Sequence, residues 1–336
     1  MLFLKLKREN FFQALGEFSE YALYVPRREG ERVLLKETSL QDLPENLDFE
    51  RTTGSAKEIL FPQEETLFYF KRYEPLERPK LEDRKKLVLG LRPCDAHGIQ
   101  VLEDNFLNLE PVDVYFKRRR ENTLLVTIAC SQFEDNCFCD SLGLGPDRLN
   151  GADAIIYDLR EALGVLSRSA ILSEKLKGYA FQFQEVENED QVEKGEVPRR
   201  DPEQLPILSP EEYLALISED KLWEKISSPC LGCASCTYLC PTCYCFDLQD
   251  VTYGPVGKRV RTYDSCMFGL YTLEASGHNP RPTLKERWRQ RFLHKFSYIP
   301  FLEGILGCTG CGRCIEVCPA GIDLREVIKD VAKFKR

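Results

Sequence analysis

The first half of the chain alternates short apolar runs with polar, turn-forming segments. Residues 86–91 (KLVLGL) and 124–130 (LLVTIAC) are apolar runs of strand length, and the second follows a ribbon that begins at Val114. Residues 154–169 predict a hairpin of two apolar strands joined by a polar turn. The same kind of pattern predicts a helix at 8–20 and strands at 22–26, 32–37 and 65–70. Together these elements predict a mixed α/β domain over residues 1–183.

The last third of the chain has helical periodicity instead. Four apolar residues of the segment 284–296 recur at every fourth position and share one helical face: Leu284, Trp288, Phe292 and Phe296. Residues 209–226 predict a helix that Ser209 and Glu212 cap, and residues 323–334 predict a final helix. Residues 184–206 are rich in Glu, Asp, Pro and Gly and predict an exposed acidic linker. The expected fold is therefore α+β, with a mostly helical domain over residues 207–336.

Two cysteine runs dominate the chemistry of this second domain. Both follow the pattern C-x2-C-x2-C-x3-C-P, in which thiolates of two-cluster ferredoxins hold [4Fe–4S] cubanes. Three cysteines spaced by three wrap one cluster, and the fourth, followed by a proline that turns the chain, suits the other cluster. The predicted ligands of the first cluster are Cys230, Cys233, Cys236 and Cys318, and those of the second are Cys308, Cys311, Cys314 and Cys240.

Zinc is the rival interpretation of these cysteines. Structural zinc sites usually combine two separated Cys pairs, or Cys pairs with His, whereas each run here packs four cysteines and a proline together. The repeated run therefore favours paired iron–sulfur clusters. A long interval separates Cys240 from Cys308, and it contains the helix predicted at 284–296. We therefore expect a helical dicluster domain rather than a compact bacterial ferredoxin.

Seven further cysteines lie outside the two runs. Four belong to the first domain, at strand ends and in loops where side chains can converge, and they could hold a third cubane: Cys94, Cys130, Cys137 and Cys139. Buried cysteines without metal are the alternative, most naturally for Cys130. The remaining three, Cys243, Cys245 and Cys266, could surround the nearby clusters or share a site with a non-cysteine fourth ligand.

Composition and charge narrow the class of protein. The chain has 336 residues, 43% hydrophobic and 30% charged, which suits two or three globular domains. No apolar run approaches the roughly 18 residues of a membrane helix, and MLFLKLKREN is too short and charged for a signal peptide. We expect a cytoplasmic protein in an anaerobic or well-reduced cell. A net charge of −8 argues against nucleic acid as a partner.

Other motifs add little. The chain lacks a G-x-G-x-x-G after a strand and a G-x-x-x-x-G-K-[ST], so no flavin or nucleotide is expected in this chain. The basic segments 117–120 (KRRR) and 281–295 have two interpretations, a docking surface for an acidic partner or an ordinary solvated face.

With these motifs in view, the chain resembles the iron–sulfur β subunit of cytosolic sulfhydrogenases, which is similar to an iron–sulfur subunit of anaerobic sulfite reductase. Related subunits occur in flavin oxidoreductase modules linked to heterodisulfide reductase. The resemblance extends from about residue 86 to residue 322. It is carried by GLRPCDAHGIQVLEDNF, CSQFEDNCFCDSLGLGP, CLGCASCTYLCPTCYCFDLQD, YDSCMF, GHNPRPTLKERWRQRF and CTGCGRCIEVCPAGI.

The resemblance implies an electron-transfer subunit. Such a subunit passes electrons between an FAD- and NAD(P)H-binding partner and a hydrogenase, a sulfite reductase or a heterodisulfide reductase subunit. Two alternatives remain open from the sequence. One is an enzyme that reduces a small sulfur compound (sulfite, sulfur or a disulfide) at a cluster near Cys94 and Cys137. The other is an interaction module that clusters merely stabilise.

Overall fold

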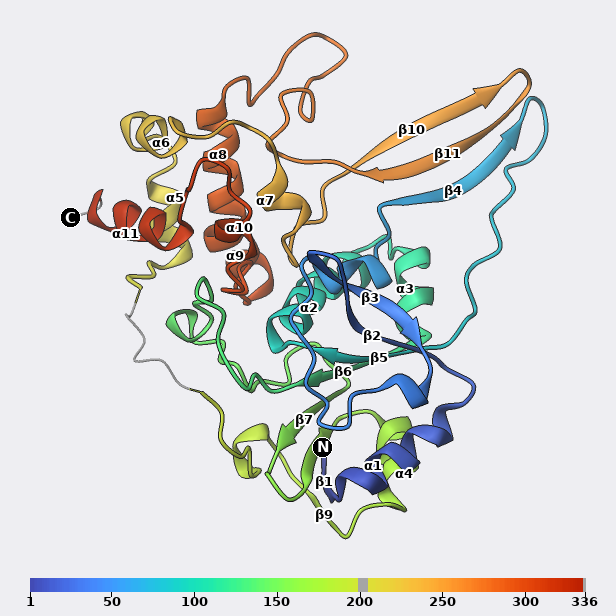
Figure 1. Cartoon of the computed structure of the whole chain (residues 1–336). Coiled ribbons are helices and arrows are strands. Elements are labelled where there is room, and N and C mark those ends of the chain that lie inside the picture. Colours follow the sequence, from blue (N-terminus) through green and yellow to red (C-terminus); the bar gives the residue numbers. More distant parts are fainter. Residues whose placement is uncertain (199–204, 335–336) are drawn as a thin grey trace.

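The computed structural model describes residues 1–198 and 205–334 and has a mixed sheet at its centre (Figure 1). Eight strands form this sheet: β1 (Leu2–Leu6), β2 (Ala22–Glu29), β3 (Arg32–Thr38), β5 (Lys86–Leu91), β6 (Thr123–Ile128), β7 (Ala154–Asp158), β8 (Leu163–Ser167) and β9 (Gln182–Glu185). Their order is β3-β2-β5-β6-β7-β8-β1-β9. Strands β2, β5, β6 and β7 are parallel, whereas the pairs toward both edges are antiparallel. The predicted strand at 86–91 and the predicted hairpin are confirmed as β5 and as β7–β8.

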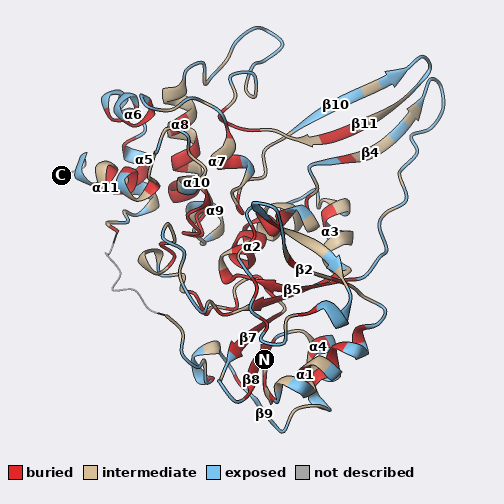
Figure 2. Ribbon diagram, in the orientation of Figure 1, coloured by how far each residue is buried: buried red, intermediate tan, exposed pale blue. Residues whose placement is uncertain are grey.

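Helices cover both faces of the sheet. They are α1 (Arg8–Leu15), α2 (Pro93–Leu107), α3 (Val114–Glu121) and α4 (Ala170–Lys177). Leu87 and Leu89 of β5 share a core with α1 and α4, whereas Val88 between them joins a core with α2 and α3. Successive side chains of a strand point to opposite faces, so an apolar run such as KLVLGL marks a strand that is buried on both sides (Figure 2).

The C-terminal region combines short helices with a projecting three-stranded sheet. The helices are α5 (Pro210–Ala215), α6 (Asp220–Ser227), α7 (Ser235–Tyr238), α8 (Leu284–Leu293), α9 (Ile299–Glu303), α10 (Arg313–Glu316) and α11 (Leu324–Phe334). Strands β10 (Phe246–Tyr253) and β11 (Val256–Tyr263) form a long hairpin, and β4 (Glu64–Lys71) pairs with β11. The hairpin qualifies the expectation of a mostly helical domain, and β4 reaches it from the first half of the chain (Figure 1). No helix in the described part of the chain is long and apolar enough to cross a membrane.

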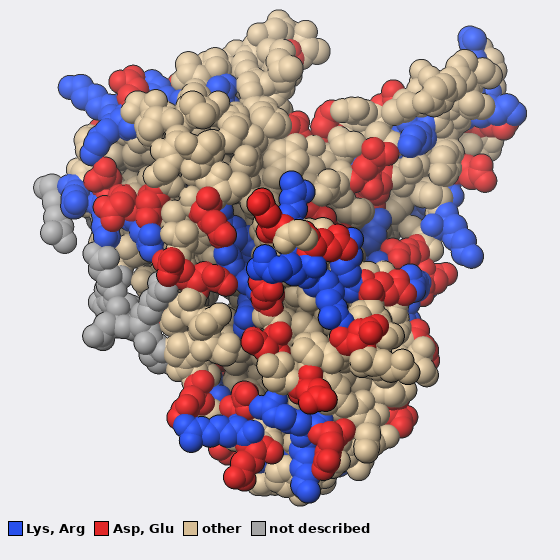
Figure 3. Space-filling model, in the orientation of Figure 1, with Lys and Arg blue, Asp and Glu red and all other residues tan. Residues whose placement is uncertain are grey.

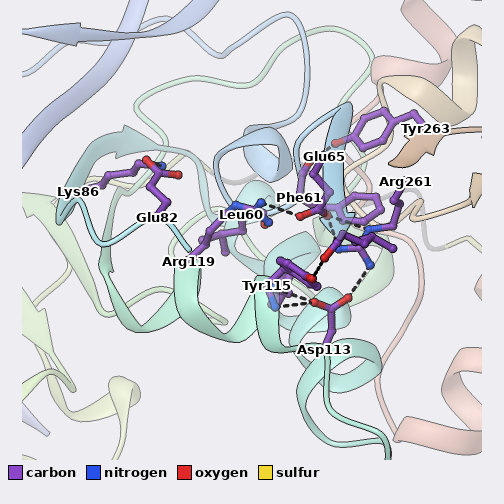
Figure 4. Close-up of polar contacts among 12 residues, drawn as sticks. Leu60, Phe61, Glu65, Glu82, Lys86, Asp113, Tyr115, Arg119, Arg261 and Tyr263 are labelled. Atoms are coloured by element: carbon purple, nitrogen blue, oxygen red, sulfur yellow. Dashed lines mark hydrogen bonds and ion pairs between the residues drawn. The ribbon is translucent and has the colours of Figure 1, made fainter. Parts of the chain in front are cut away.

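Buried ion pairs hold the three-stranded sheet against α3, one of the helices that cover the large sheet (Figure 4). Arg261 of β11 donates from Nε to Glu65 of β4 at 2.8 Å and from a terminal nitrogen to Asp113 at 2.5 Å. Arg119 of α3 also donates to Glu65, at 2.6 Å. Arg261 and Glu65 are both buried. Because breaking one partner of a buried pair leaves the other charge uncompensated, this network fixes β11 against α3.

Three local expectations differ from the structure. The ribbon expected from Val114 is helix α3, because Asp113 accepts hydrogen bonds from the first N–H groups of that helix. The helix expected at 209–226 keeps its capping box but breaks into α5 and α6. Residues 184–198 of the expected linker are mostly exposed, as expected, but Val186 and Val192 are buried in a core with strands of the sheet, and residues 199–204 lie outside the described residues.

Helix α2 packs against the cysteine-rich region. An added Cβ at Gly98 would lie 2.3 Å from Cβ of Pro241, so only glycine allows this approach. His97 Nε2 lies 2.8 Å from the carbonyl oxygen of Leu306, and Tyr244 donates to Asn105 at 2.6 Å. The helix that follows β5 therefore lies directly against the segments around both cysteine runs.

Candidate iron–sulfur site

The two cysteine runs fold into matching loops. Each passes through a left-handed residue, Ala234 with φ 63° or Gly312 with φ 76°, into a one-turn helix, α7 or α10. In each run the amide of the fourth cysteine donates to the carbonyl three residues earlier at 3.3 Å. Since α7 and α10 pack against each other, the fourth cysteine of each loop is carried toward the other loop.

The first site is a cavity whose walls carry thiols. Its lining includes the three leading cysteines of the first run together with the last cysteine of the second run: Cys230, Cys233, Cys236 and Cys318. Cys314 and Arg291 also line it, and the remaining wall is largely apolar, with Met267, Trp288 and Leu324. Cys233 is exposed, so this site lies at the surface of the protein.

The second site is deeper in the protein. Cys308 and Cys311 are each 7% exposed, and burial raises the pKa of Cys308 to about 12, opposed by Lys295. Burial also raises the pKa of Cys314, and the neighbouring charges of Cys308, Cys311 and Cys240 raise it further. A hydrogen bond from Cys243 and the nearby ammonium of Lys295 hold the pKa of Cys240 well below its usual value. Cys240 thus lies within electrostatic reach of Cys308 and Cys314.

The third group gathers the four cysteines of the first domain. Strands β5 and β6 are parallel neighbours, so the segments that follow them, with Cys94 and Cys130, leave the sheet at the same edge. Burial raises the pKa of Cys130 to about 11, and the neighbouring charge of Cys137 adds to this effect. Burial likewise raises the pKa of Cys139, with contributions from Asp140 and Cys130. Cys130 therefore lies within electrostatic reach of Cys94, Cys137 and Cys139.

This third group lies against the second cysteine run. The amide of Phe138 donates to the carbonyl of Gly310 at 2.8 Å, and Cys137 Sγ lies 3.7 Å from the carbonyl oxygen of Cys311. Arg313, in the same run, is fully buried and pairs with Asp95, beside Cys94, at 3.0 Å. The loop around Cys137 and Cys139 is therefore packed onto the loop around Cys311.

The remaining cysteines form their own cluster next to the second site. Cys245 and Cys266 are hydrogen-bonded to each other, which lowers the pKa of Cys245 to about 6. Cys243 lies against Cys240, as noted above. Among the described residues, no three Cys, His, Asp or Glu side chains are arranged to hold a single metal ion. The thiols of the first site instead ring a cavity, an arrangement that fits a multi-iron cluster better than one ion.

Buried cations are the site residues that sequence reasoning missed. Arg291 and Lys295 belong to the basic segment 281–295, for which the sequence predicts a docking or solvated role, yet both are only 3% exposed and lie among the cysteines. Lys57, from the short 3-10 helix Ala56–Ile59 far away in sequence, is also buried and donates to the carbonyls of Cys240 and Cys243 at 3.0 and 2.8 Å. The one sequence signal for this burial is the apolar face of the helix at 284–296. Arg291 and Lys295 each precede a phenylalanine of that face, so they can lie on its buried side.

Comparison with known proteins agrees with this geometry. Residues 229–322 match the family model of the 4Fe-4S dicluster domain. The chain is 33% identical to sulfhydrogenase 2 subunit beta of Pyrococcus furiosus over 344 aligned positions, which cover 98% of each protein. It is also 34% identical over 90 residues to an uncharacterized iron–sulfur protein of Methanococcus maripaludis, covering 23% of this chain and 16% of that protein. The chain therefore belongs to the sulfhydrogenase β-subunit family and is an iron–sulfur protein with a 4Fe-4S dicluster domain.

Proposed function

We propose that this chain relays electrons between a partner subunit that binds FAD and NAD(P)H and a terminal hydrogenase or reductase. The observation that carries the proposal is the succession of thiol groups, from the exposed Cys233 to the buried second run and on to Cys137, which contacts that run, and Cys94, in the first turn of α2. Clusters held by such thiols supply one-electron redox chemistry. The name of the Pyrococcus relative, which is a sulfhydrogenase subunit, supports the same role.

The ligand sets follow from which thiols share a site. Cys230, Cys233, Cys236 and Cys318 would hold one [4Fe–4S] cluster, and their common cavity supports this set. Cys308, Cys311, Cys314 and Cys240 would hold the other, supported by their mutual electrostatic contacts. The chain's own contribution is to bury the second set, to orient Cys240 through Thr242 at 3.2 Å, and to leave Cys233 accessible.

A third cluster would occupy Cys94, Cys130, Cys137 and Cys139. The convergence of these thiols at one sheet edge and their packing against Gly310 support it. Two cubanes contain about eight irons per chain and three about twelve. We expect an anaerobic iron count near twelve that falls toward eight when Cys137 and Cys139 are both replaced by serine. A count near eight, unchanged by these replacements, would refute the third cluster. A count that falls only on replacing Cys243, Cys245 and Cys266 would move the site there.

The surface near the first site would exchange electrons with a partner. Leu231, which lines the first site between Cys230 and Cys233, is 70% exposed. In Figure 3 the middle of the upper half of this face is mostly uncharged, while charged side chains lie at its upper left, along the projecting arm at its upper right and over its lower half. Exposed apolar residues near a redox site suit a protein–protein contact.

Native complexes provide the test of this function. The chain, tagged at its C-terminus and purified anaerobically from its own cells under gentle conditions, should bring down a flavin-containing subunit together with a hydrogenase or reductase subunit. Dye reduction by NAD(P)H should then require the flavin subunit. A native chain that elutes alone, or a complex that transfers electrons equally well without this chain, would contradict the proposal.

A further inference from the structure

The helical segment between the two cysteine runs changes from α-helix to π-helix next to the cysteines. Helix α8 ends at Leu293, residues 294–298 form a π-helix, and α9 begins at Ile299. Short π-helical turns are rare and often occur at functional sites. Arg291 lies in the last turn of α8 and Lys295 lies in the π-helix, and both cations are buried among the thiols.

Lys295 links the two cysteine runs directly. Its ammonium donates to Cys240 Sγ at 3.1 Å, to Thr242 Oγ1 at 2.7 Å and to the carbonyl of Gly307 at 3.2 Å. Cys240 is the last cysteine of the first run, and Gly307 immediately precedes Cys308 of the second. These three contacts use all three donors of the ammonium group.

Arg291 occupies the equivalent place at the first site. It lines the cavity that also contains Cys236 and Cys318, and its guanidinium lies 4.9 Å from the ring centre of Trp288. Its Nε is buried and has no hydrogen-bond partner within the described residues. The side chain is thus a buried donor next to thiols rather than part of a solvated basic face.

Neither cation has a conventional counter-ion. In the part of the chain that the structure describes, no Asp or Glu forms an ion pair with Arg291 or Lys295; the charges that stabilise each cation are those of cysteines. A buried charge without compensation is strongly unfavourable, so an anion must share these sites. Four thiolates around each cluster provide that negative charge.

We propose that Arg291 and Lys295 are positioning residues that act as built-in counter-charges and raise the reduction potentials of the two clusters. Lys295 acts on the cluster held through Cys240, and Arg291 acts on the cluster held through Cys236. Each one-electron reduction adds one negative charge to a cluster, and a nearby fixed cation favours that reduced state. A hydrogen bond to the ligand sulfur acts in the same direction. This inference rests on the proposed function, because it requires that the thiols hold redox-active clusters.

The test is a redox titration of the full chain, purified anaerobically and followed by electron paramagnetic resonance. The variants are Lys295→Gln, Lys295→Met, Lys295→Arg and Arg291→Met. Lys285→Met is the control, since Lys285 lies on the same helix but pairs with Asp220 at 3.0 Å. At a fixed potential, the reduced-to-oxidised ratio of one cluster should fall at least tenfold in Lys295→Gln, a shift of about 59 mV.

Lys295→Arg should stay near the wild-type midpoint because it keeps the charge, and Lys285→Met should not move it. Arg291→Met should lower the midpoint of the other cluster. If iron is lost from the Gln and Met variants but kept in the Arg variant, the need for the charge is supported. If all three variants lose iron, the shape of the side chain matters and the inference fails.

The two proposals fail in different ways. Wild-type protein with both clusters but an unshifted midpoint in Lys295→Gln would overturn the counter-charge inference and leave the proposed function intact. Wild-type protein without redox-active iron would overturn both.

Discussion

Gly310 offers a sharp test of how the first domain packs onto the second cysteine run. It has a φ of +64°, and an added Cβ would lie 2.5 Å from both Cα and N of Cys139. Its carbonyl accepts the hydrogen bond of Phe138 N–H at 2.8 Å. Because the atoms that Cβ would meet belong to backbone, a small side-chain rotation cannot relieve the overlap. Gly310→Ala should therefore separate the two loops.

The expected magnitude has two parts. A left-handed conformation costs a residue with a Cβ roughly 1–2 kcal/mol, and inserting atoms into a closely packed site costs about 1–3 kcal/mol. Gly310→Ala should therefore destabilise the fold by roughly 2–5 kcal/mol. Gly321 is the matched control, because it has a φ of +63° but no heavy atom within 4 Å of an added Cβ. Gly321→Ala should show only the conformational part, roughly 1–2 kcal/mol.

Anaerobic urea denaturation of the three proteins, followed by fluorescence of Trp223 and Trp288, compares these costs. Both tryptophans are buried in the C-terminal core. The midpoint of Gly310→Ala should lie clearly below that of Gly321→Ala, which should lie below that of the wild type. Equal midpoints for the two variants would refute the close packing of the loop around Cys139 on the second run.

Three further predictions address ligands, cofactors and pH. Cys318→Ala should damage the cluster of the first run and spare that of the second, as judged by electron paramagnetic resonance; the opposite pattern would reverse the proposed ligand sets. The purified single chain should bind no FAD and oxidise no NADH, whereas a stoichiometric yellow protein would assign the flavin to this chain. Burial, with the charge of Asp104, raises the pKa of Glu303 to about 7 from its usual 4.5. The folded state therefore binds this proton more tightly than the unfolded state, and its stability decreases as pH rises from about 4.5 to 7. Glu303→Gln should raise the thermal midpoint at pH 8 and leave it nearly unchanged at pH 4.5; an equal change at both values would exclude this titration.

The fold could be predicted best where one local rule decided the structure. Apolar runs such as residues 86–91 fit only a strand buried on both faces, and Ser209 with Glu212 marks a helix start through its capping box. Strand β10 gave no such signal, because most of its residues are exposed and it is held by pairing with β11. Strand β4, which is remote in sequence, adds a third strand to this hairpin by pairing with β11. No local sequence pattern indicates that pairing.

The candidate site, like the fold, could be predicted only where a local sequence pattern indicates it. The spacing of the two runs leads to a prediction of the ligand sets, because three cysteines at steps of three can wrap one cluster and the fourth suits the other cluster. The cations could not be found in this way. Lys295 is buried because a π-helical turn brings it to Cys240 and Gly307, and the partners that compensate its charge are distant thiols. A sequence pattern of basic residues does not distinguish this case from a solvated face.

The central claim is that the cysteines of this chain hold redox-active iron–sulfur clusters. The most direct test is to measure iron, zinc and acid-labile sulfide in the full chain after anaerobic purification, together with the number of electrons it accepts from dithionite. The purified chain should contain at least about eight irons with matching sulfide and should take up one electron for each cubane. Zinc in place of iron, or iron that accepts no electrons, would contradict it.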